Sequence, residues 1–253
     1  SSIGKKGTTF LWDLTLESPA TVDIWSGHSK PVLDLAQTTD SIHMLTASAD
    51  ETIGVWNMET GHLTRRLRGH DSYVNCVATC VPSGKSGGAS TSSTKDVVAS
   101  IDDQGKCLLW DLRSKNPIGE FYHEWPLTSC CFGMNGSNYL FAGGLDNIMY
   151  QYDLRNGMSG RSQTVLRVYD GHNDTITGLS LSPCGSYVLS NGMDEKLIQW
   201  DIRPFVISEE KRIVNVYQGH EHNFEKLMLR CSWSADGKSI SCGSSDAMVN
   251  VWN

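Results

Sequence analysis

The sequence has no long apolar run. Among its 253 residues, none forms the stretch of roughly 18 apolar residues that a membrane-spanning helix requires, and the first residues show no signal-peptide pattern. We therefore expect no membrane association. Apolar residues make up 39% of the chain and charged residues 19%, which is typical of a folded globular protein.

The sequence also lacks a basic excess. It has 21 basic and 28 acidic residues, for a net charge of −7, whereas proteins that grip RNA phosphates over a broad face are usually basic. The nearest basic cluster, Arg65, Arg66 and Arg68, lies on a strand-like segment and is typical of a solvated outer strand edge. We expect RNA contact to be indirect or minor.

Cofactor motifs are missing too. The eight cysteines form no C-x-x-C pair, and Cys76, Cys130, Cys131 and Cys231 lie inside strand-like runs, which indicates free buried thiols in a reducing compartment. The histidines of His220-Glu221-His222 are too close together for the helical zinc motif. Gly84-Lys85-Ser86 lacks the first glycine of a P-loop, because position 79 is Thr79. We expect no metal, no cofactor and no small-molecule substrate.

Internal repetition is the strongest pattern that the sequence does contain. A Gly-His pair recurs in register with the repeats at four positions, ending at His28, His70, His172 and His220. An aromatic residue followed by Asp or Asn closes a repeat at six positions, at Trp12, Trp56, Trp110, Tyr152, Trp200 and Trp252. Successive aromatic positions lie roughly 40 to 55 residues apart, near the period of a propeller blade.

Each repeat contains short apolar or alternating segments separated by Gly, Ser, Asn and Asp, which predicts strands joined by tight turns. An aspartate stands six residues before the aromatic position in four repeats, at Asp50, Asp146, Asp194 and Asp246. We expect this aspartate in the turn before the last apolar strand, because its short side chain can accept hydrogen bonds from nearby backbone N–H groups.

These repeats resemble those of the WD-repeat family. The resemblance implies an all-β fold, a WD40 β-propeller that is seven-bladed when complete and here incomplete at both ends. It implies one domain over residues 1–253, with five complete repeats and the end of another. The Ser/Gly/Thr-rich insertion at about 82–95 is expected to be a mobile surface loop.

The resemblance further implies a buried network in each repeat, in which the Gly-His imidazole meets the aspartate, a serine and the tryptophan indole. His28, Ser48, Asp50 and Trp56 supply the full set. The corresponding residues elsewhere are His70, Asp103, Trp110, Asp146, His172, Asp194, Trp200, His220, Ser244, Asp246 and Trp252. Because the set recurs, we expect it to hold blades together rather than to form a catalytic triad.

Two repeats depart from this pattern. The turn at Asp102-Asp103-Gln104-Gly105 is about one residue longer than its counterparts, and the fourth repeat keeps Asp146 but has no Gly-His. We expect these blades to be less stable, since a buried network with a missing member leaves polar groups unpaired.

Several stretches show a narrower resemblance: GGLDN at 143–147, TGLSLS at 177–182, WDIRPF at 200–205, HNFEK at 222–226 and LRCSWS at 229–234. They resemble the WD-repeat proteins of the U5 small nuclear ribonucleoprotein, a spliceosome component. This resemblance implies a nuclear, non-catalytic scaffold in pre-mRNA splicing. Its implied partners are the large U5 scaffold protein and other spliceosomal proteins.

The sequence raises two other functions, a ubiquitin-ligase substrate receptor and a propeller enzyme. Arg113, Arg155 and Arg203 each follow an aromatic-Asp pair by two positions, which resembles the W-D-x-R feature of WD-repeat substrate receptors of cullin ubiquitin ligases. The plainer interpretation is that they bridge to neighbouring blades. A propeller enzyme with acidic residues at the channel mouth is disfavoured, because strand segments such as 74–78 and 177–181 have no clustered carboxylates.

The expected partner-binding residues are Phe224, Phe205, Trp125 and Arg203, all on connections where binding residues commonly lie. Cys231 lies eleven residues after His220, whereas Leu179 lies seven after His172. Four added residues must therefore bulge from the connection at 222–226, and we expect Phe224 to be its apolar anchor.

Overall fold

The computed structural model describes residues 2–3, 7–13, 15, 20–80, 97–133, 138–155, 165–205, 212–223 and 227–253. Across these residues every regular element is a β-strand. The strands form six sheets, called blades 1 to 6 below, and the blades belong to two compact units. Unit 1 ends at Glu124 and unit 2 begins at Trp125 in the described chain, and each unit is described by itself.

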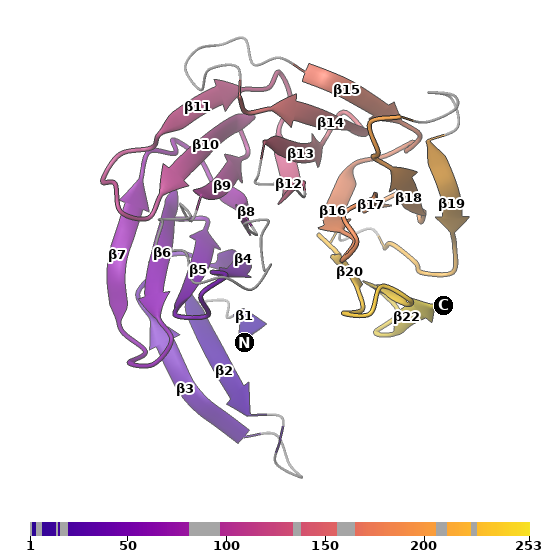
Figure 1. Cartoon of the computed structure of the whole chain (residues 1–253). Coiled ribbons are helices and arrows are strands. Elements are labelled where there is room, and N and C mark those ends of the chain that lie inside the picture. The colour runs from indigo at the N-terminus through magenta and orange to yellow at the C-terminus, as the bar shows by residue number, and fades with distance from the viewer. Residues whose placement is uncertain are drawn as a thin grey trace, which may run out of the picture. The chain divides into compact units, whose positions relative to one another are not determined.

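Unit 1 contains blades 1 to 3. Their strands, shown from indigo to magenta in Figure 1, are β1 (Ser2–Ile3), β2 (Thr8–Asp13) and β3 (Ala20–Ser26) in blade 1, β4 (Val32–Gln37), β5 (His43–Ser48), β6 (Thr52–Asn57) and β7 (Leu63–Arg68) in blade 2, and β8 (Val74–Thr79), β9 (Val97–Asp102), β10 (Lys106–Asp111) and β11 (Gly119–Tyr122) in blade 3.

Unit 2 contains blades 4 to 6. Their strands are β12 (Leu127–Phe132), β13 (Tyr139–Gly144), β14 (Ile148–Asp153) and β15 (Val165–Asp170) in blade 4, β16 (Ile176–Leu181), β17 (Tyr187–Gly192), β18 (Leu197–Asp201) and β19 (Ile213–Tyr217) in blade 5, and β20 (Cys231–Trp233), β21 (Ile240–Gly243) and β22 (Val249–Trp252) in blade 6.

Within each blade the strands follow one another in chain order and all pairs are antiparallel. Blades 2 to 5 have four strands, as β4 to β7 show in Figure 1. Consecutive four-stranded antiparallel sheets of this kind are the blades of a β-propeller. The all-β propeller fold predicted from the repeats is therefore confirmed.

The second and third strands of a blade form its core. In β5, β9 and β13 the first residue is half-buried and the other five are buried, whereas four of the six residues of the outer strand β15 are exposed. Inner strands read as nearly continuous apolar runs because a neighbouring sheet covers each of their faces. The outer strand has one free edge, so polar and apolar residues mix there.

In β3 and β15, one apolar side chain near the end of the outer strand packs on the next blade of the same unit. Trp25 of β3 stacks on Trp56 of β6, with ring centroids 5.8 Å apart and planes at 14°. Tyr169 of β15 meets Trp200 of β18 edge-on at 5.6 Å. Such contacts position one sheet against the next within a unit. Trp25 and Tyr169 each stand three residues before the histidine of the next Gly-His pair. This spacing is a further sequence signal of the repeat.

The turn after the second strand has the same left-handed residue in four blades. Glu51, Asn147, Glu195 and Ala247 all have φ between 60° and 69°. Each follows the recurring aspartate, and in blades 2 and 6 the aspartate Oδ1 accepts a backbone N–H just beyond the turn, from Thr52 at 3.2 Å and from Met248 at 3.0 Å. The aspartate thus holds a conformation that is unfavourable for a residue other than glycine.

Two expectations about domain organisation remain predictions. The insertion at 82–95 lies outside the described residues. The single domain over residues 1–253 and the seven-bladed complete ring also stay predictions.

In blades 2 and 5 the glycine of the Gly-His pair is required by the tryptophan of its own blade, whereas a Cβ atom on Gly219 of blade 6 would meet nothing within 4 Å. A Cβ atom on Gly171 would lie 2.8 Å from Cη2 of Trp200, and one on Gly27 would lie 2.8 Å from Cη2 of Trp56. These separations are shorter than any ordinary carbon contact.

We therefore expect Gly171→Ala to lower the free energy of unfolding by about 1–3 kcal/mol through overpacking. Urea denaturation monitored by tryptophan fluorescence measures the change. Gly243→Ala is the matched control in unit 2, since its Cβ would meet only Leu229 Cδ2 at 3.6 Å. Equal stability of the two variants would contradict this explanation of the motif.

Candidate functional site

The buried network of blade 2 connects four segments of chain. Nδ1 of His28 lies 2.9 Å from Oδ2 of Asp50, and Nε2 of His28 lies 2.6 Å from Oγ1 of Thr46. The indole Nε1 of Trp56 donates to the same Thr46 oxygen at 2.9 Å. The expected hydrogen bond between His28 and Asp50 is thus present.

The chemistry of these groups fixes the direction of each hydrogen bond. A carboxylate can only accept, so Nδ1–H of His28 donates to Asp50, and the unprotonated Nε2 accepts the hydroxyl proton of Thr46. Every group then has a partner: indole N–H to hydroxyl, hydroxyl to imidazole, imidazole N–H to carboxylate. The arrangement requires a neutral imidazole and an ionised aspartate.

The pKa shifts agree with these charge states. Burial lowers the pKa of the His28 imidazole below its usual value, against the opposing effect of the Asp50 carboxylate. Burial alone would raise the pKa of Asp50, but hydrogen bonds from Thr52, His28 and the Ser29 N–H outweigh it and lower this pKa to about 2.

Blade 5 repeats the network. His172 Nδ1 lies 2.9 Å from Asp194 Oδ1, and its Nε2 lies 2.6 Å from Ser190 Oγ. Trp200 Nε1 donates to Ser190 Oγ at 2.7 Å. The hydrogen bond expected between His172 and Asp194 is present, and the hydroxyl of Ser190 was missed.

Blade 3 has the same arrangement with two residues that differ from expectation. His70 Nδ1 lies 2.8 Å from Asp102 Oδ2, so the longer turn places Asp102 in the network and not Asp103. His70 Nε2 lies 2.6 Å from Ser100 Oγ, which accepts Trp110 Nε1 at 2.8 Å.

The expectation that Ser48 and Ser244 join the networks is not met by the geometry. The hydroxyl residue stands ten positions before the tryptophan in all three networks, at Thr46, Ser100 and Ser190, whereas Ser48 stands eight before. Ser48 Oγ instead donates to Pro31 O at 2.9 Å. Ser244 Oγ accepts the Glu221 N–H at 2.9 Å.

Blades 4 and 6 have no hydroxyl at this position. Blade 4 has Ala142 ten residues before Tyr152, and Asp146 there accepts a hydrogen bond from Tyr150 Oη at 2.7 Å. Blade 6 has Cys242 ten residues before Trp252.

The network of blade 6 is accordingly not assembled. Within the described part of the chain, both ring nitrogens of His220 and both of His222 are buried without a hydrogen-bond partner. Burial lowers the pKa of both imidazoles. Asp246 accepts a local hydrogen bond from the Met248 N–H. The Trp252 ring meets the His220 ring edge-on, with centroids 6.2 Å apart.

The assembled networks share the Ser-His-Asp order of a hydrolase triad, but no substrate could reach their hydroxyl groups. Thr46, Ser100 and Ser190 are each 0% exposed, and each hydroxyl already serves both an imidazole and an indole. A nucleophile must contact the substrate, so these groups are suited to holding the blade together.

Each W-D-x-R arginine pairs with the aspartate two residues before it. Arg203 reaches both oxygens of Asp201, with Nε to Oδ1 at 3.0 Å and Nη2 to Oδ2 at 2.5 Å. Arg113 with Asp111 and Arg155 with Asp153 form the same pairs.

The bridging arginines come from the outer strands instead. Arg65 of β7 donates to the carbonyls of Leu112 and Ser114 in blade 3, both at 2.7 Å, and Arg167 of β15 donates to Pro204 O in blade 5 at 3.0 Å. Arg65 therefore has a structural role that a solvated edge would not give it.

Of the expected partner-binding aromatics, Phe205 is 93% exposed and Trp125 is 52% exposed. Phe224 lies outside the described residues. The structure adds Leu145, which is 49% exposed and joined to the Trp125 loop by its N–H to Pro126 O at 3.1 Å. Leu145 stands among glycine, aspartate and asparagine residues that predict a tight turn. An apolar residue in such a turn is the signal that could have identified Leu145 as exposed.

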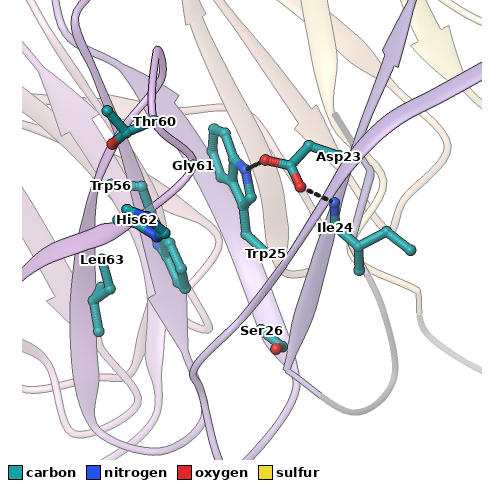
Figure 2. A pocket seen from close by; sticks show the side chains of 9 residues that line it. All are labelled: Asp23, Ile24, Trp25, Ser26, Trp56, Thr60, Gly61, His62 and Leu63. Carbon is teal, nitrogen blue, oxygen red and sulfur yellow. Dashed lines mark hydrogen bonds between the residues drawn. The ribbon is translucent and has the colours of Figure 1, made fainter.

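Two small cavities flank the networks. One, of about 300 Å³, lies between Asp23 and Trp25 of β3 and the turn at 60–63; Figure 2 shows the Trp25 indole N–H donating to Asp23. The other, of about 320 Å³, is lined by Asp194, Glu195, His220 and Glu221, among others. In the described ranges no group of three or more His, Cys, Asp or Glu side chains could hold a metal ion. No helix that could cross a membrane occurs in those ranges either.

Blades 2, 3 and 5 are four-stranded sheets that each hold a buried His-hydroxyl-Trp network, and this arrangement defines the class of WD-repeat propellers. The chain matches the WD40 family (WD domain, G-beta repeat) over residues 20–57, 61–111, 163–201 and 211–253, and it belongs to that family.

Within the family, the chain is similar to proteins of the splicing machinery. It is 36% identical to the U5 small nuclear ribonucleoprotein 40 kDa protein of Dictyostelium discoideum, over 100% of this chain and 66% of that protein. It is 40% identical to the human protein of the same name, over 77% of this chain and 49% of that protein. The pre-mRNA-splicing factor cwf17 of Schizosaccharomyces pombe is 31% identical, over 91% of this chain and 62% of that protein. The chain thus spans about half to two thirds of the length of these relatives.

Removing one hydroxyl tests the network. We expect Ser190→Ala to lower the free energy of unfolding by about 1–3 kcal/mol, because it leaves the His172 and Trp200 ring nitrogens buried and unpaired. Thermal and urea unfolding measure the change. Ser232→Ala, on the exposed side of β20, is the matched control and should unfold like the wild type; a similar loss in both variants would argue against the network.

Acidification tests the charge states. The pKa of His28 is lowered in the folded state, so the unfolded chain takes up the proton first and stability falls as the pH drops below about 6.5. Asp50 contributes stability that is present above its unfolded pKa of about 3.8 and is lost as the pH falls through about 2. We expect Asp50→Asn to be less stable at pH 7 and to lose less stability than the wild type between pH 4 and pH 2, as measured by urea denaturation. Parallel curves for the two proteins would show that Asp50 is not the group responsible.

Proposed function

We propose that this chain is a non-catalytic, nuclear protein-interaction scaffold of the spliceosomal U5 small nuclear ribonucleoprotein, and that it docks on the large U5 scaffold protein. The similarity to U5 40 kDa proteins over the whole chain is the observation that carries the proposal. The named splicing factor from fission yeast supports the same process.

The geometry suits a scaffold better than an enzyme. The three His-hydroxyl-Trp networks are buried, and their hydroxyl groups have no solvent access. Three of the exposed apolar side chains lie on connections between strands, at Trp125, Leu145 and Phe205, while others lie on strands such as β3 and β22. Rigid sheets with apolar residues on their connecting loops are typical of proteins that hold other proteins.

Protein partners are favoured over RNA. The net charge of −7 opposes broad contact with a phosphate backbone. The arginines that could contact phosphate pair with carboxylates two residues away, as Arg155 does with Asp153 at 2.6 Å. This internal pairing also accounts for the W-D-x-R arginines without a ubiquitin-ligase adaptor.

Affinity purification of the tagged chain from nuclear extract, followed by mass spectrometry, tests the proposal. We expect U5 proteins, the large scaffold protein foremost, to co-purify in amounts that RNase treatment does not change. Recovery of cullin-ligase adaptor subunits in place of U5 proteins would contradict the proposal and support the substrate-receptor alternative.

A further inference from the structure

The side chain of Phe205 is exposed to an unusual degree. It is 93% exposed, more than any other large apolar side chain of the described residues. A fully exposed phenyl ring loses the favourable free energy of burial, so a binding role would explain what packing does not.

The loop that carries Phe205 is held by three arginines. Arg203 is fixed by its two-oxygen pair with Asp201 and lies over the Tyr187 ring at 5.9 Å. Arg212, which is 4% exposed, donates through Nη1 to Asp201 O at 3.0 Å and to Arg203 O at 3.1 Å.

The third arginine comes from the preceding blade. Arg167 of β15 donates to the carbonyl of Pro204 at 3.0 Å, and the ring of Pro204 fixes its own φ. The backbone on the N-terminal side of Phe205 is therefore held at residues 201, 203 and 204.

Such ordering lowers the cost of binding. A residue that is already held in place loses little conformational entropy when a partner covers it. The corresponding loop of blade 3 has the same arginine-aspartate pair at Arg113 and the same bridge from Arg65, yet has Ser114 and Lys115 in place of Pro204 and Phe205. The apolar tip is thus added to a common frame and is not needed to build it.

The surroundings of Phe205 indicate the chemistry of the partner. The Arg203 side chain is 56% exposed, and among the described residues its Nη1 has no hydrogen-bond partner, so it can still donate. Its charge is balanced by Asp201, which weakens any attraction to a phosphate backbone. An apolar ring beside a charge-balanced donor fits a protein pocket better than a nucleic acid.

We propose that residues 203–205 are a docking point at which Phe205 enters an apolar pocket of a protein partner, while Arg203 donates to a carboxylate or backbone carbonyl at the rim of that pocket. This inference rests on the proposed function, and the partner is therefore the large U5 scaffold protein.

The test is the affinity of the full chain for the purified large U5 scaffold protein, measured by isothermal titration calorimetry. Phe205→Ala should weaken binding by about ten- to a hundredfold, the effect of removing one buried phenyl ring. Phe205→Leu, which keeps most of the apolar surface, should lose less than about tenfold. Melting temperatures should match the wild type, because the side chain packs on nothing that folding requires.

Met248→Ala is the matched control, since this side chain is also apolar and exposed, at 62%, and lies in a different blade, in the turn before β22. It should bind like the wild type. If the wild type binds and Phe205→Ala binds within about twofold of it, the docking point is wrong and the proposed function stands. If the wild type does not bind, both are wrong. A labelled single-stranded RNA that binds the wild type and not Phe205→Ala would assign the loop to nucleic acid and overturn the inference.

Discussion

A single buried hydroxyl group determines whether the histidine, aspartate and tryptophan of a blade form one hydrogen-bonded network. In blades 2, 3 and 5 it lies between an imidazole and an indole, donating to one and accepting from the other, at Thr46, Ser100 and Ser190. The network joins the connection before the first strand, the second strand, the turn and the third strand. Because each group is buried, losing one partner costs the others about 1–3 kcal/mol apiece. The identity of Gly27 and Gly171 follows from the same constraint, since the indole of their blade occupies the space that a Cβ would need.

Blades 4 and 6 show what happens when the hydroxyl is absent. Blade 4 replaces the network with a hydrogen bond from Tyr150 to Asp146. In blade 6, Cys242 occupies the hydroxyl position and both His220 nitrogens are unpartnered within the described chain. A thiol is a weak donor and acceptor and cannot satisfy a buried imidazole and an indole together. We expect local unfolding to cost the least free energy in the blades whose networks are incomplete.

Repetition in the sequence was enough to predict the propeller, the aspartate of the turn and the tryptophan of the third strand. It did not distinguish Thr46 from Ser48, because side chains two positions apart on a strand point to the same face. Nor did it distinguish Asp102 from Asp103, since the longer turn offers two adjacent carboxylates and only the backbone path selects one. Sequence reasoning also did not find the aspartate partners of the W-D-x-R arginines. It expected these arginines to bridge neighbouring blades, a role that Arg65 and Arg167 have in the structure. The exposure of Phe205 was anticipated from its place on a connection, but the three arginines that hold its loop come from three separate segments.

Hydrogen exchange of the tryptophan indole N–H groups, followed by NMR, tests the central role of the buried hydroxyl most directly. Trp56, Trp110 and Trp200 each donate to such a hydroxyl, whereas Trp125 is 52% exposed. The account predicts that the first three indole protons exchange only through unfolding of their blades, many orders of magnitude more slowly than the Trp125 proton. Exchange of those three at the rate of Trp125 would contradict it.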